Sequence, residues 1–203
     1  MHHLIGVMIV SALLSFGQVA SADPYEDGNA AYNRGDYATA LKLWRPLAEQ
    51  GNAVFQGAIG MMYMSGNGVI QDYKEAMKWF RLSADQGHAP AQGIVGMMYE
   101  RGLGVVQDYK EAMKWYRLSA KQGHAPALSP LGGMYADGRG VLQDYVRAHM
   151  WLNLAGASMS GDNAKITSNE RDKIAAKMTP AQIERAQEMA RKCQQSKFRD
   201  CGW

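Results

Sequence analysis

Cysteine is scarce in this chain of 203 residues, which contains only Cys193 and Cys201. Two neighbouring cysteines exclude the paired spacings of structural zinc sites and a framework of several disulfides. The sequence also lacks a glycine-rich phosphate loop, and it has no serine or cysteine that we can place beside a histidine and a carboxylate. These absences predict a protein that is not an enzyme and needs no metal or other cofactor.

Charge is missing from the beginning of the chain, because residues 1–22 contain no Lys, Arg, Asp or Glu. Their apolar run, Leu4 to Phe16, is shorter than the about 20 residues that span a bilayer as a helix. The small-residue pattern Ala20-Ser21-Ala22 follows, which is typical of a cleavage site. We predict a signal peptide over residues 1–22, and a membrane anchor is the alternative. The mature protein is then periplasmic or secreted, without a membrane span.

A large excess of one charge sign is also missing, since the net charge is only +3. This balance does not favour nucleic acid, whose phosphates are bound by dense basic surfaces. The excess lies in residues 163–203, which hold nine Lys or Arg against five Asp or Glu. We interpret this part as a solvated helical face, and contact with nucleic acid or anionic lipid is the alternative.

What the chain does contain is an internal repeat. Residues 72–107 and 108–143 are identical at most positions without a gap, and fainter copies with the same spacing lie on both sides. Periods of 20 to 50 residues are typical of solenoids, in which each unit buries its apolar face only against its neighbours. The repeat therefore predicts one continuous stack with a long surface.

Each copy begins with Asp-Tyr, and Asp is a favourable N-cap. Apolar residues follow at helical spacing, with charged residues between them, which predicts an amphipathic helix that ends at a glycine. A second helix follows in each copy. Its centre carries a glycine, which destabilises a helix by about 1 kcal/mol relative to alanine. Because the glycine recurs, we expect a compensating contact, namely a close approach to the neighbouring helix. The residues of these patterns are Asp36, Asp72, Asp108 and Asp144 for the starts, Gly51, Gly87 and Gly123 for the ends, and Gly60, Gly96 and Gly132 for the centres.

This sequence pattern closely resembles the SEL-one-like repeat family, a relative of the tetratricopeptide repeat, and in particular its bacterial exported members. The matching residues, with their equivalents one repeat away, are Ala91, Gly96, Tyr99, Gly102, Gly104, Val105, Asp108, Ala112, Trp115, Ala120 and Gly123. The resemblance implies an all-α fold, a right-handed α/α solenoid of about four 36-residue helix pairs. It also implies adaptor proteins, with no common chemistry.

The repeat has two departures from its pattern. Pro130 would lie inside a helix begun at Pro126, so we expect that helix to restart with Ser129 as its cap. The spacing also lengthens at residues 158–162. We therefore predict an N-terminal capping helix at 23–35, the repeat solenoid at 36–157, and C-terminal capping helices with a disulfide-bearing tail at 158–203. One capping helix is expected at 164–177, and the capping box Thr179 to Gln182 starts another.

Cys193 and Cys201 are expected to form a disulfide, since an exported protein meets an oxidising compartment. The bond requires the last helix to end between them, because eight further helical residues would separate the Cα atoms by about 12 Å. Two free thiols are the alternative. His88 and His124 recur one repeat apart at a turn, and we interpret them as polar turn residues, with a metal site as the alternative.

Methionines recur along the second helices. Met62, Met98 and Met134 align with the core stripe, whereas Met61 and Met97 are predicted to face the inner groove, where flexible thioethers suit varied partners. The alternative is that all of them are packed inside. The polar residues expected around this groove are Gln56, Gln92, Glu100 and Arg101.

These patterns favour a non-catalytic interaction module, expected to be a monomer, whose groove binds a protein or peptide in the cell envelope. The alternative is an accessory binder of envelope glycan or lipid, or a secreted host-facing effector, that uses its basic and aromatic surface. Binding lost on changing Met61, Met97 and Gln92 would favour the groove, and binding lost on removing the chain after Thr179 would favour the envelope.

Overall fold

The computed structural model describes residues 23–203. The predicted signal peptide at residues 1–22 lies outside the described residues. Residues 23–203 form helices and contain no β-strand. The elements are α1 (Pro24–Asn33), α2 (Tyr37–Glu49), α3 (Ala53–Ser65), α4 (Tyr73–Asp85), α5 (Ala89–Arg101), α6 (Tyr109–Lys121), the 3-10 helix η1 (Ala125–Ala127), α7 (Leu128–Asp137), α8 (Tyr145–Ser158), α9 (Gly161–Ala175) and α10 (Pro180–Gln195).

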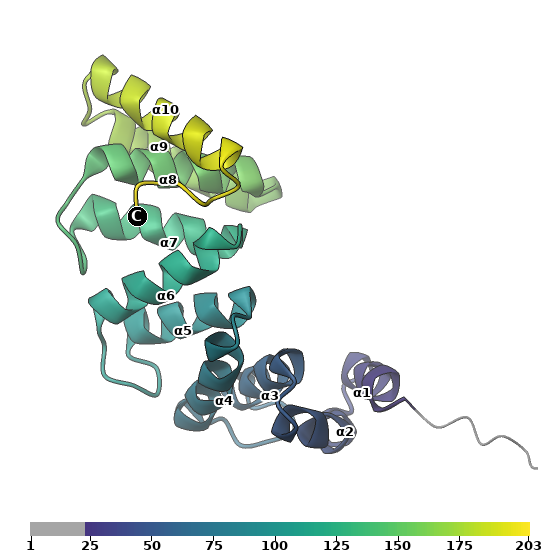
Figure 1. The fold of residues 1–203 in the computed structure, drawn as a ribbon. Coiled ribbons are helices and arrows are strands. Elements are labelled where there is room, and N and C mark those ends of the chain that lie inside the picture. Colours follow the sequence, from purple (N-terminus) through teal and green to yellow (C-terminus); the bar gives the residue numbers. More distant parts are fainter. Residues whose placement is uncertain (1–22) are drawn as a thin grey trace, which may run out of the picture.

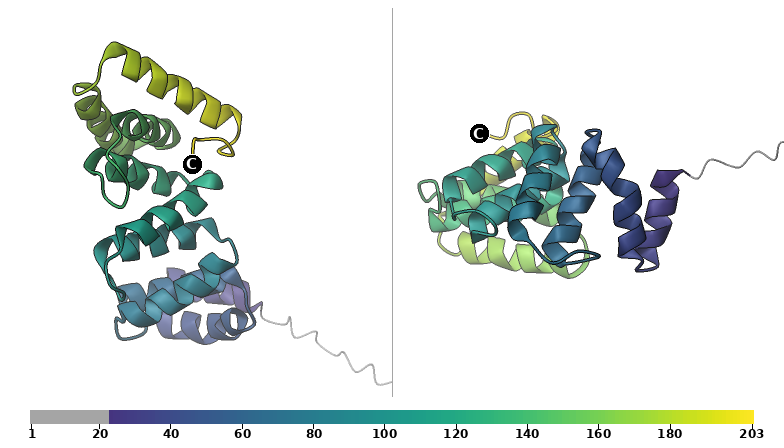
Figure 2. Two further views of the ribbon diagram at one scale, coloured as in Figure 1. Left: turned by 60° about the vertical axis from the view of Figure 1, so that its left-hand side comes forward. Right: turned by 90° about the horizontal axis from the view of Figure 1, so that it is seen from below.

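The helices α1 to α9 stack in chain order, so the predicted α/α solenoid is confirmed (Figure 1). Two further views show α1 and α10 at opposite ends of this stack (Figure 2). The first helix of each pair is called an A helix here, and these are α2, α4, α6 and α8. The B helices are α1, α3, α5, α7 and α9. Within residues 23–203, no helix is both long and apolar enough to cross a membrane.

Each A helix starts at its predicted aspartate. The Asp72 carboxylate accepts hydrogen bonds from the backbone N–H groups of Lys74, at 2.8 Å, and Glu75, at 3.0 Å. Asp108 makes the same pair of bonds one repeat later. These bonds satisfy N–H groups that have no partner inside the helix, and the negative charge lies at the positive end of the helix dipole. One side-chain type thus fixes where each repeat begins.

The central glycine of each B helix lies under a large side chain of the following A helix. A Cβ atom on Gly60 would be 2.9 Å from the ring of Phe80, and one on Gly96 would be 2.9 Å from the ring of Tyr116. The predicted close approach is therefore present, although a side chain and not the helix backbone fills the space. The rings Phe80 and Tyr116 are almost completely buried as a result.

The third B helix differs from its prediction. Ser129 is not its cap, because η1 continues directly into α7, and the residue before α7, Ala127, has helical backbone angles. Pro130 does lie in the first turn, where a missing N–H costs nothing. Ala127 and Leu128 are fully buried, and burying both requires the chain to take its helical path before Ser129.

The last two helices close the stack in different ways. α9 begins at Gly161, three residues before its predicted start, and packs on α8. α10 has the predicted capping box, in which Thr179 Oγ1 accepts from the Gln182 N–H and the Gln182 side chain accepts from the Thr179 N–H. α10 packs mainly on α8, although α9 precedes it in the chain. The exact boundaries of solenoid and caps stay predictions.

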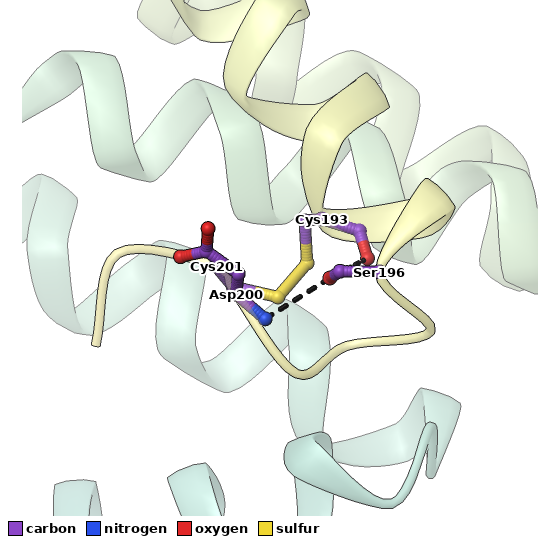
Figure 3. Close-up of a disulfide and its surroundings, with 4 residues drawn as sticks. All are labelled: Cys193, Ser196, Asp200 and Cys201. Carbon is purple, nitrogen blue, oxygen red and sulfur yellow. Dashed lines mark hydrogen bonds between the residues drawn. A yellow bond between two sulfur atoms is a disulfide. The ribbon is translucent and has the colours of Figure 1, made fainter.

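The structure contains the disulfide between Cys193 and Cys201, with Cα atoms 4.5 Å apart (Figure 3). α10 ends at Gln195, between the two cysteines, as the bond requires. Ser196 Oγ donates to the Cys193 carbonyl at 2.8 Å and accepts the Asp200 N–H at 3.0 Å. The C-terminal tail, residues 196–203, ends with the Trp203 ring 5.1 Å from that of Trp151.

The glycine contact generates a test within one helix. Gly60→Ala is expected to lower the free energy of unfolding by about 1 kcal/mol or more, because overpacking costs more than the gain in helix propensity returns. Gly57→Ala is the matched control, since its nearest neighbour would be Ser83 Oγ at an ordinary 3.5 Å. Urea unfolding followed by circular dichroism measures both variants. Equal stability of the two variants would contradict the contact.

Removing the disulfide by Cys193→Ser and Cys201→Ser is expected to lower the free energy of unfolding by about 2.5 kcal/mol, the chain-entropy value for so short a loop. Without the bond the tail should leave Trp151. In the wild-type protein, this release is measured as a shift of tryptophan fluorescence when the disulfide is reduced. A Trp203→Ala variant is the control, because its fluorescence should not respond to reduction in this way. A reduced protein with unchanged stability and spectrum would contradict the assignment.

Candidate functional site

The methionines of the B helices divide as predicted between core and surface. Met62, Met98 and Met134 are fully buried. Met61 is 36% exposed, and Met97 is half-buried at the edge of the core. Met61, Met97 and the partly buried Met64 can therefore contribute to a binding surface, and of these Met97 alone lines one of the three hollows described below.

Met97 lies in a hollow of about 300 Å³ on the B-helix side of the stack. We call this hollow and its continuation the B-helix groove. Prolines and aliphatic side chains supply most of its apolar surface, and charged residues of α5 form part of its wall. Its lining consists of Pro90, Gly93, Ile94, Met97, Glu100, Arg101, Tyr116, His124, Pro126 and Pro130.

The groove continues beyond this hollow toward the end of the stack. A second hollow, of about 520 Å³, shares Pro126 with the first and reaches α9. A third, of about 310 Å³, shares Glu170 with the second and is also lined by Arg139. The three hollows thus lie beside one another along α5, α7 and α9, since neighbouring hollows share a lining residue.

Glu100 is held by two partners beside the first hollow. Its carboxylate accepts the hydroxyl of Tyr116 at 2.7 Å and pairs with the Arg139 guanidinium at 2.8 Å. Burial raises the pKa of Tyr116, and the hydrogen bond to the Glu100 carboxylate raises it further. Tyr116 therefore stays protonated and acts as a fixed donor. Within residues 23–203, Arg101 makes no salt bridge, so its exposed charge is available at the groove.

Two of the predicted polar groove residues are placed elsewhere. Gln56 and Gln92 are each only 5% exposed. The Gln92 amide donates to the Ala84 carbonyl at 3.1 Å, and its oxygen accepts from Gln122 at 2.8 Å. Gln56 makes equivalent bonds one repeat earlier. Their expected position on the groove surface was wrong, because these amides satisfy buried backbone groups between repeats.

The histidine turns carry hydrogen bonds. Ser83 Oγ donates to the Ala53 carbonyl at 2.6 Å and lies 3.1 Å from His88 Nδ1, so this ring nitrogen is the donor in that contact. His124 lies beside Ser119 in the next turn. No group of three or more potential ligands is present in residues 23–203. The interpretation as polar turn residues fits this geometry.

The polar groove residues that the sequence reasoning missed include Tyr116, Arg139 and Glu170. Signals were present for Tyr116, whose equivalent Phe80 has no hydroxyl, and for Arg139, whose equivalent Leu103 has no charge. Glu170 had no such signal, since it lies after the repeats and approaches the groove only through the packing of α9.

Comparison with known families decides which class of repeat this is. The Sel1 repeat model matches four segments, residues 18–52, 55–88, 89–124 and 125–158. The chain belongs to the Sel1 repeat family. This confirms the resemblance to SEL-one-like repeats. Sel1 repeats generally mediate protein–protein interactions, and the family is generally a non-catalytic scaffold.

Solved structures of other Sel1 repeat proteins have the same fold. One is a protective antigen present in uropathogenic Escherichia coli strains that displays an SLR fold, with 37% identity and a TM-score of 0.64 over 68% of this chain. Another is a Sel1 repeat protein from Oxalobacter formigenes, with 32% identity and a TM-score of 0.64 over 70% of this chain. The matches span 30% and 57% of those two chains. Among curated proteins, none matches this sequence.

The stability of this Sel1 repeat protein is expected to fall as the pH decreases from about 7 to 5. Burial lowers the pKa of His88, His124 and His149 below the ordinary value of 6.5. In that interval the unfolded chain binds protons that the folded chain does not, so acid favours unfolding. Urea unfolding at several pH values measures the slope.

The equivalent turn residue Asn52 suggests the matched variants for this test. Asn52 caps α3 with its side chain, so His88→Asn and His124→Asn should keep the fold while removing two titrating groups. The pH slope should become shallower in this double variant. Stability that rises on acidification, or an unchanged slope, would contradict the role of the histidines.

Proposed function

We propose that this Sel1 repeat protein is a non-catalytic, exported interaction module that binds an extended peptide or protein segment in its B-helix groove. The observation that carries the proposal is the hollow of about 300 Å³ beside Met97. Its apolar lining with a few fixed polar groups is the usual composition of a recognition pocket.

The chemistry of the groove supports a partner with an apolar side chain next to an acidic group. Ile94, Met97 and Pro130 offer apolar contacts, and the methionine can adapt its shape. Arg101, which is exposed and makes no salt bridge within residues 23–203, suits a carboxylate. The Glu100 carboxylate pairs with Arg139, which also pairs with Asp137, and this partner weakens its repulsion of such a ligand. A protein or peptide partner fits these groups without a cofactor.

An envelope location is part of the proposal. The predicted signal peptide at residues 1–22 and the disulfide between Cys193 and Cys201 both favour an oxidising compartment. One similar protein is a protective antigen of uropathogenic Escherichia coli strains. A periplasmic or secreted protein is consistent with that relative.

The test is crosslinking in living cells followed by affinity capture, with a Met97→Glu/Arg101→Glu variant beside the wild type. Partners that depend on the groove should be reduced at least tenfold in the variant, because charge is introduced at the apolar contact and reversed at the arginine. Leu142→Glu is the control, since Leu142 is 91% exposed on a loop and lines none of the three hollows. Capture of the same proteins by both variants would refute the groove.

Glycan or lipid binding by the C-terminal part needs a different test from truncation. Removing the chain after Thr179 would strip α10 from α8 and expose the core, so the loss of binding would be uninformative. Lys165→Glu with Arg191→Glu reverses two exposed charges and leaves α10 in place. Loss of sedimentation with cell-wall or anionic vesicles in this variant would favour the alternative function.

A further inference from the structure

On the A-helix side of the stack, α8 has another helix of the same chain, α10, packed on it. On α8, Met150 and Leu154 are fully buried in a cluster that includes Ala186 and Ala190 of α10. Val146 of α8 lines a small hollow with Arg185 and Met189 of α10. We call Val146, Met150 and Leu154 the outer stripe of α8, and α10, an amphipathic helix of the same chain, packs on this helix.

The same stripe is uncovered on the two preceding A helices. Leu82 of α4 and Leu118 of α6 occupy the position of Leu154, yet they are 50% and 36% exposed, whereas Leu154 is 0% exposed. The other two stripe positions differ in chemistry as well. They are lysines, namely Lys74, Lys78, Lys110 and Lys114, where α8 has Val146 and Met150.

The charges of α4 and α6 differ sharply from those of α8. α4 and α6 together contain seven basic and three acidic residues, and α8 contains a single charged residue, Arg147. α10 carries Arg185, Arg191 and Lys192 against Glu184 and Glu188, so its small net positive charge suits the uncharged stripe better than the lysine-rich one. The occupant of the open stripe must carry the opposite charge.

We propose that the A-helix stripe of α4 and α6, formed by Leu82, Leu118 and their flanking lysines, binds an amphipathic helix of a partner protein with acidic residues beside its apolar face. The partner helix lies on this stripe as α10 lies on α8. Leucines of the partner contact Leu82 and Leu118, and its carboxylates face the lysines. This site is separate from the B-helix groove and does not depend on the proposed function.

The lysines are available to such a partner. Lys74 and Lys110 are exposed and make no salt bridge in the part of the chain that the structure describes. Lys78 and Lys114 pair with Glu75 and Glu111 of their own helices at 2.7 and 3.5 Å, with lysine side chains 71% and 61% exposed. Such exposed pairs contribute little, so a second carboxylate can join them at small cost.

The C-terminal tail limits the site on one side. Lys121 at the end of α6 lies 5.1 Å from the Trp203 ring, and the Phe198 ring lies close to Gly123. The chain's own end therefore occupies the surface beyond the last turn of α6. The open stripe consists of α4 and the part of α6 before Lys121.

The experiment uses three synthetic peptides of 16 residues, the length of α10. Two have the same leucine stripe at helical spacing, one with glutamate and one with lysine beside it. The third has the composition of the glutamate peptide in scrambled order. Fluorescence anisotropy with the purified protein should show at least tenfold tighter binding of the glutamate peptide than of either control, weakening as salt screens the lysines.

Leu82→Glu/Leu118→Glu should weaken binding of the glutamate peptide at least tenfold, whereas Leu142→Glu, on a loop outside both proposed sites, should leave it unchanged. Both leucines are exposed, so unchanged helicity by circular dichroism is expected for the variant. Binding of the scrambled peptide with equal affinity would mean that charge alone attracts the peptide, and this would overturn the proposal. No binding of the glutamate peptide, or an equal loss of binding in the Leu142→Glu control, would overturn it as well.

Discussion

The contact between a glycine of each B helix and a large side chain of the next A helix is the constraint on which the stack depends. Gly60 with Phe80 and Gly96 with Tyr116 show it most clearly. Because a Cβ atom would not fit, the distance between successive helices is fixed by these pairs. The buried glutamines then satisfy the backbone groups that this close packing covers.

The repeats remain alike where they touch one another and differ where they face outward. Tyr116 keeps the aromatic ring of Phe80 over a glycine but adds a hydroxyl that holds Glu100. Val146 and Met150 replace lysines on α8, and this change creates the seat of α10. Function in such a stack is thus encoded by departures from the repeat, because the shared residues are already used for packing.

Periodicity predicted most of the fold, including the aspartate caps, the glycine ends and the capping box at Thr179. It did not predict the start of α7, because the burial of Leu128 is a tertiary effect that a cap pattern does not contain. The candidate site was predicted in part. Met97, Glu100 and Arg101 line the groove, whereas Gln92 is buried, since spacing identifies a helix face but not which polar groups the neighbouring repeat satisfies.

The disulfide and the aromatic contact of Trp203 make the two ends of the stack unequal. In a one-dimensional array each repeat is held by its neighbours, so opening proceeds inward from whichever terminal unit is most weakly attached. At one end, the Cys193–Cys201 bond ties the last turn of α10 to a tail that rests on Trp151. α1 has no such tie in the described part of the chain and packs chiefly against α2. The array therefore has a direction of fraying, from α1 toward the cross-linked end.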